Sequence, residues 1–251
     1  MKEYTVSDLF FTKWQDLKPK AHAIAYACHS AARATNAAKP EYGHLLINTL
    51  RPLRKRPLLV DKINVEQAID IYNDLKFLNE PWYYFPAIGT LKHFIPPAEK
   101  MARHTFDHFI YSDNEYSLYI VTGDALYLRR LLVTLYQMPC DTYFDKECVE
   151  EREAAIRGKV KDWQLNLVFF TYAQIREFVM KRCRTLMPKP IVSAEEEVKP
   201  TPTGPMWLKL KHRLSETPAY PGMEKAARAN MYEALDYLED LAQIKERNAK
   251  P

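Results

Sequence analysis

Glycine is scarce in this chain: six of the 251 residues are glycine, whereas 17 are proline. Tight hairpin turns and phosphate-cradling loops need backbone positions with positive φ, which glycine supplies most readily. So few glycines argue against hairpin-rich β-folds and against nucleotide-binding loops. Aromatic residues make up 12% of the chain, which is more than a disordered chain carries, and the length suffices to bury a core. We therefore expect a folded protein with few tight turns.

Apolar residues recur with a helical period in nearly every long segment, and prolines separate the segments. Pro96 and Pro97 are expected to open one helix, Gly123 to break the chain and Asp124 to cap the next helix. Residues 114–122 fit either a helix or a strand. Longer helical segments are residues 20–38, 64–80, 124–136, 145–157 and 160–186, and shorter ones begin near Ser7 and Tyr42. The sequence therefore predicts an all-α fold.

The chain is expected to divide into three parts. Residues 1–187 form a multi-helix orthogonal domain, and residues 188–205, rich in proline and charge, form a largely extended linker. Residues 206–251 form a C-terminal helical hairpin, with helices at 206–214 and 223–246. The second of these helices carries a clean apolar stripe, which must dock on the main domain or on a partner.

Charge and cysteine usage point to a reduced, cytoplasmic environment. The net charge is +4, which is too small a balance to indicate nucleic-acid binding by itself. The four cysteines form no metal-binding or redox motif, and the N-terminus lacks the apolar core of a signal peptide. The most apolar window, residues 165–173, is too short to cross a bilayer. We expect no membrane partner.

Five aromatic residues are candidates for protein binding. Trp82, Tyr83 and Tyr84 lie in an aromatic stretch bracketed by prolines, which predicts a rigid loop. Aromatic side chains are enriched at binding hot spots, but aromatic residues between prolines also serve as plugs in the core under a loop. Trp207 and Tyr237 are the corresponding candidates in the C-terminal hairpin.

A short basic turn carries an alternative function. Arg51, Arg54, Lys55 and Arg56 are close together in the sequence and could contact phosphates. The same residues could equally form a solvated loop between helices. A nucleic-acid-binding protein is therefore the first alternative to a protein-binding one.

Two histidines carry a second alternative, a metal-dependent enzyme. His104 and His108 are spaced by one helical turn, so that they can share a metal, but Thr105 stands where a metalloprotease needs glutamate. Both histidines could instead lie on the polar flank of an amphipathic helix. No nucleophile motif, phosphate loop or dinucleotide fingerprint is present in the sequence, so we predict no catalytic residues and no cofactor.

Three segments have the aromatic-rich helical pattern of a known group of proteins. They are residues 64–85 (NVEQAIDIYNDLKFLNEPWYYF), 106–136 (FDHFIYSDNEYSLYIVTGDALYLRRLLVTLY) and 231–241 (MYEALDYLEDL). They resemble helical proteins encoded among the tail and morphogenesis genes of phages and prophages of gut bacteria, some of which are taken for tail-assembly factors. The resemblance implies a non-catalytic role in assembly, phage structural proteins as partners, and a place in the host cytoplasm or the virion.

Overall fold

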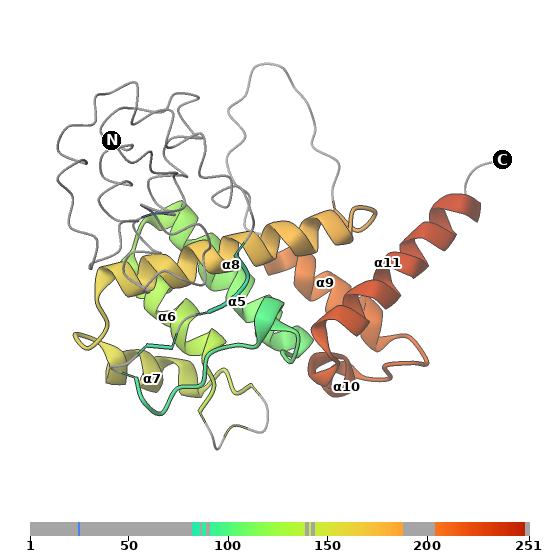
Figure 1. The fold of residues 1–251 in the computed structure, drawn as a ribbon. Helices are drawn as coiled ribbons and strands as arrows, with labels where there is room; N and C mark the ends of the chain where they lie inside the picture. Colours follow the sequence, from blue (N-terminus) through green and yellow to red (C-terminus); the bar gives the residue numbers. More distant parts are fainter. Residues whose placement is uncertain are drawn as a thin grey trace, which may run out of the picture. The chain divides into compact units, whose positions relative to one another are not determined.

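The computed structural model describes residues 25, 82–85, 87–88, 91–138, 141, 144–187 and 204–248. These residues form seven α-helices and one short 3-10 helix (Figure 1). The described part contains no strand, only two isolated bridges that join Ile95 to Gln137 and Thr105 to Asn230. The prediction of an all-α fold is confirmed.

The central helices follow the predicted pattern over most of their length. They are the 3-10 helix η4 (Glu99–Met101), α5 (Phe106–Thr122), α6 (Ala125–Leu135), α7 (Cys148–Ile156) and α8 (Asp162–Arg182). Residues 114–122, for which the sequence left helix and strand open, complete α5. The predicted helices at 124–136 and 160–186 correspond to α6 and α8 within a few residues at each end.

The helix predicted to begin at Pro96 and Pro97 begins later, at Phe106. Thr105 is its N-cap, and its side chain accepts a hydrogen bond from the backbone N–H of His108. Lys100 and Met101 have φ angles of 53° and 60°, a left-handed conformation that a right-handed helix does not contain. The segment before Thr105 is therefore a short turn and not the start of α5.

The C-terminal part contains three helices where two were predicted: α9 (Gly204–Ser215), α10 (Met223–Arg228) and α11 (Met231–Asn248). The predicted helix at 223–246 is interrupted at Ala229 and Asn230. The Asn230 side chain caps α11 by accepting from the backbone N–H of Tyr232 at 3.0 Å. The Ala229 carbonyl accepts from the backbone N–H of Phe106 at 2.9 Å. A local cap at Asn230 and a contact of Ala229 with a distant segment thus coincide at the break between α10 and α11.

Two compact units divide the chain, Met1–Trp82 with Asp162–Phe170, and Tyr83–Lys161 with Thr171–Pro251. In the second unit α5 packs against α6 and α9, α6 packs against α7, and α9 packs against α10. Its core contains Phe106, Phe109, Leu131, Leu132, Leu135, Tyr136 and Trp207, all 0% exposed. The C-terminal helices belong to the same compact unit as α5. Most of the linker predicted at 188–205 lies outside the described residues.

The turn between α5 and α6 has the local chemistry that the sequence predicts. Gly123 ends α5 in the left-handed conformation, with φ of 69° and ψ of 5°. Asp124 then caps α6, because its carboxylate accepts from the backbone N–H of Leu126 at 2.8 Å. Both residues are exposed, so the turn depends on backbone conformation and capping rather than on burial.

Replacing Gly123 by alanine is expected to lower the free energy of unfolding by about 1 kcal/mol. A Cβ at this position would meet no other atom within 4 Å, so the cost arises from the positive φ alone. Urea denaturation of the wild type and of Gly123→Ala measures the difference. A matched control is Ala125→Ser, an exposed position one residue inside α6. An unchanged stability of Gly123→Ala would contradict the left-handed turn.

Candidate functional site

The aromatic segment predicted to bind proteins is divided between core and surface. Phe85 is 6% exposed and its ring meets Tyr136 edge-on, with ring centroids 6.1 Å apart. Tyr84 is 45% exposed, and its hydroxyl donates to the Glu99 carboxylate at 2.6 Å. Trp82 and Tyr83 are half-buried. Phe85 is thus a core plug, whereas Tyr84 is the member of the segment that faces solvent.

Lys100 fixes the position of Tyr83 from the neighbouring turn. Its ammonium lies 5.0 Å from the ring centroids of both Tyr83 and Phe178, which is within the range of cation–π attraction. Its backbone N–H donates to the Tyr83 carbonyl, and its own carbonyl accepts from the Tyr232 hydroxyl at 2.7 Å. These contacts offset the cost of the left-handed backbone at Lys100. Tyr83 therefore belongs to a structural clamp.

Trp207, a predicted protein-binding residue, lies in the core. It is 0% exposed, and its ring packs edge-on against Phe109 with centroids 4.8 Å apart. Its indole N–H donates to the Asp113 carboxylate at 2.6 Å. The ring is large and apolar, and its one polar atom has a buried partner, so burial is favourable.

Asp113 is the centre of a buried polar cluster that the sequence did not reveal. Its side chain is 0% exposed and joins α5 to α8 and α9. Besides Trp207, it accepts from the Arg176 guanidinium at 2.6 Å and from the Tyr172 hydroxyl at 3.4 Å. A carboxylate that is buried away from water needs such hydrogen-bond donors, because a buried unpaired charge is strongly unfavourable. We interpret the cluster as structural, since its groups satisfy one another.

His104 and His108, the predicted metal ligands, do lie close together. Both are 2% exposed, and their ring centroids are 4.9 Å apart. The prediction that they share one helix face is wrong, because His104 precedes α5 and only His108 belongs to it. The expectation that they form a polar flank is wrong as well, since both side chains are buried.

Hydrogen bonds define the protonation of both rings. His104 Nε2 lies 3.0 Å from the Leu135 carbonyl oxygen, which can only accept, so Nε2 carries the proton. His108 Nδ1 lies 2.9 Å from the Thr105 hydroxyl, and its Nε2 lies 3.2 Å from the Gln137 amide nitrogen. The amide donates, so His108 carries its proton on Nδ1 and its imidazole is neutral.

Electrostatics favour the neutral form of both rings. Burial lowers the pKa of His104 below its usual value. Burial, followed by the charge that His104 would carry, lowers the pKa of His108 to about 3. Within the described residues, no group of three or more His, Cys, Asp or Glu side chains lies close enough to hold a metal ion. The geometry indicates that His104 and His108 connect the start of α5 to the end of α6.

Tyr237 lies on the part of α11 that reaches the surface. The helix buries Met231, Ala234, Leu235, Leu238 and Ala242 against its own unit. Tyr237 and Leu241 are half-buried, and Ile244 is 52% exposed. Tyr237 also packs edge-on against Tyr220, with centroids 5.6 Å apart. The predicted apolar stripe is therefore covered along its first turns and reaches solvent along its last turns.

The basic turn, Arg51, Arg54, Lys55 and Arg56, lies outside the described residues, so its prediction stays untested. Among the described helices, none combines the length and the apolar content that a bilayer crossing requires. Comparisons of the chain with protein-family models, curated proteins and solved structures found no match. Function must therefore be inferred from the residues and their geometry.

Proposed function

We propose that the chain is a non-catalytic protein-interaction or assembly factor, of the tail-assembly kind that its helical segments resemble. In this proposal the last turns of α11 contact a partner protein. Tyr237, Leu241 and Ile244 recur at spacings of four and three residues, so they share one face of the helix. A face of this kind is the side that a partner helix or groove recognises.

The exposure of Ile244 is the observation that carries the proposal. Ile244 is a large apolar side chain, 52% exposed, at the end of the stripe. Covering it with a partner lowers the free energy, because apolar surface is removed from water. In Figure 1 the last turns of α11 extend past α9 and α10 of the same unit. The Asp113 side chain hydrogen-bonds to Trp207 and Arg176, and both ring nitrogens of His108 have protein partners, which fits a structural role for these two buried groups.

Binding of the proteins encoded beside this one tests the proposal. Each neighbour is mixed with the full chain, and complexes are detected by size-exclusion chromatography with light scattering and measured by calorimetry. We expect one neighbour to bind, and Ile244→Asp to weaken that binding about tenfold or more, because an apolar contact residue becomes a charge.

Leu208→Asp is the matched control, since Leu208 is 48% exposed on α9 and lies off the α11 stripe. It should leave the dissociation constant unchanged. The proposal fails if the protein stays monomeric and binds none of its neighbours. If both substitutions weaken binding equally, the part of the proposal that places the binding surface on α11 fails.

A further inference from the structure

Arg130, on α6, interacts with two carboxylates, one at the surface and one buried. Its Nη2 donates to the Glu150 carboxylate of α7 at 3.0 Å, and the Glu150 side chain is 81% exposed. Glu115 lies on α5, which packs against α6, and is only 8% exposed. Burial raises the pKa of Glu115, and the positive charge of Arg130 opposes that rise. Arg130 therefore has two possible ionic partners.

The buried side of this arrangement is incomplete. The Oε2 atom of Glu115 and the Nε atom of Arg130 are both buried, and neither has a hydrogen-bond partner among the described residues. A carboxylate oxygen accepts hydrogen bonds, whereas the Nε–H of arginine only donates, so each atom supplies what the other lacks. Burying a polar atom without a partner is unfavourable, because its hydration is lost and not replaced. A bond between these two atoms would remove both penalties.

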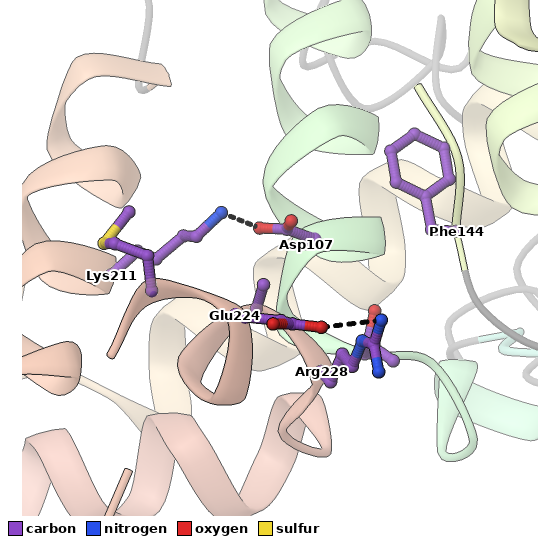
Figure 2. A pocket seen from close by; sticks show the side chains of 8 residues that line it. Asp107, Phe144, Lys211, Glu224 and Arg228 are labelled. Atoms are coloured by element: carbon purple, nitrogen blue, oxygen red, sulfur yellow. Dashed lines mark hydrogen bonds and ion pairs between the residues drawn. The ribbon is translucent and has the colours of Figure 1, made fainter. Parts of the chain in front are cut away.

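The ion pair that Arg130 makes with Glu150 is a weak one. The two side chains are 27% and 81% exposed, and an exposed pair contributes little free energy and is screened by salt. The Asp107–Lys211 pair shows the opposite case: Figure 2 draws these two side chains facing each other, and they are only 22% and 12% exposed. Exchanging Glu150 for Glu115 would thus cost Arg130 little and would satisfy two buried atoms.

The exchange does not require α7 to leave the fold. In its second half α7 buries Glu153 and Ile156. Arg129, next to Arg130 on α6, pairs with Glu153, whose side chain is 4% exposed. These contacts hold α7 against α6 whichever carboxylate Arg130 binds. The change is therefore confined to the first turn of α7, where Glu150 lies.

We propose that Arg130 is a salt-sensitive switch, which binds Glu150 at low ionic strength and Glu115 at high ionic strength. Salt screens an exposed pair far more than a buried pair, so added salt shifts the equilibrium toward the buried partner. The shifted state leaves the Glu150 carboxylate on the surface of α7 without its ion pair. This inference rests on α5, α6 and α7 and is independent of the α11 surface.

NMR of the arginine side chains on the full chain tests the exchange. The Nε–Hε signal of Arg130 is assigned by its loss in Arg130→Lys, and its exchange with water slows when Hε bonds to Glu115. Raising sodium chloride from about 50 mM to about 500 mM at neutral pH should slow this exchange about threefold or more. The Nε–Hε signal of Arg129, which is paired with Glu153, is the internal reference. An Arg130 rate that salt does not slow relative to Arg129 overturns the proposal.

Two variants assign the partners. Glu150→Ala removes the surface carboxylate and should slow the Arg130 exchange at low salt to the rate of the wild type at high salt. Glu115→Met keeps an unbranched side chain of similar length but removes the acceptor, and it should abolish the effect of salt. Glu151→Ala, at an exposed neighbouring position of α7, is the matched control and should behave like the wild type.

The outcomes of these variants decide between a switch and a fixed surface pair. Circular dichroism checks folding, and the exposed variant Glu150→Ala suffices for the test if Glu115→Met does not fold. An unchanged Arg130 rate in Glu150→Ala would show that the two carboxylates do not compete, and it overturns the proposal. A salt effect that persists in folded Glu115→Met overturns it as well, because the buried partner is then not Glu115.

Discussion

Asp113→Ala is expected to lower the free energy of unfolding by about 3 kcal/mol, which is a large share of a typical domain's stability. The substitution leaves the Arg176 guanidinium without its buried carboxylate and orphans the Trp207 indole N–H inside the core. Arg176 is 23% exposed, so water recovers part of its solvation and the loss stays at the lower end for a broken buried pair. Urea denaturation at neutral pH measures the change.

Two further variants test the cause of that loss. Trp207→Phe keeps an aromatic ring against Phe109 but removes the donor, and it should cost about 1 to 2 kcal/mol. Asp240→Ala removes a carboxylate from an exposed position of α11 and should stay within about 0.5 kcal/mol of the wild type. If Asp113→Ala costs no more than Asp240→Ala, the carboxylate is not the centre of the cluster.

Acidification from pH 7 to pH 5 is expected to destabilise the fold by about 2 kcal/mol through His108, and the lowered pKa of His104 adds to this loss in the same direction. Folding lowers the pKa of both, and that of His108 to about 3, so the native His108 ring stays neutral in this window. The unfolded rings bind protons below about pH 6.5. The stability from the two histidines is therefore complete above that pH and is lost as the pH falls toward the folded pKa.

The range from pH 7 to pH 5 lies above the pH at which protonation of carboxylates with lowered pKa values destabilises the fold. Arg157, together with Arg129, holds the pKa of Glu153 below its usual range, so its contribution is lost only at lower pH. Urea denaturation at several pH values gives the slope. A double variant, His104→Gln with His108→Gln, should flatten the slope even if its stability at pH 7 is lower. An equally steep slope in the double variant would refute the assignment to these histidines.

Local sequence signals predicted the helices well. The stop at Gly123 and the cap at Asp124 depend on residues that are neighbours in the chain, and both are found where the pattern indicates. The start of α5 and the break between α10 and α11 were not predicted. Each boundary has a local N-cap, Thr105 or Asn230, and a hydrogen bond from the Phe106 N–H to the Ala229 carbonyl also joins the two distant segments. Helical period carries no information about such contacts.

The candidate sites were harder to predict than the helices. The sequence singled out Trp207 for its residue type, but its partner Asp113 lies 94 positions away. It paired His104 with His108 by spacing, which correctly brought them together, but their burial arises from packing against the end of α6. The Asp107–Lys211 pair spans 104 positions and left no local signal at all. Tertiary proximity, which spacing does not encode, therefore decides all three sites.

The interaction role of α11 is tested most directly by hydrogen exchange of the chain alone and in complex with the neighbour-encoded protein that binds it. The last turns of α11, from Leu241 onward, should exchange rapidly in the free chain, because few contacts cover them. We expect the complex to slow exchange there, with little change in α5 and α6. Protection confined to other helices, with α11 unchanged, would contradict the account.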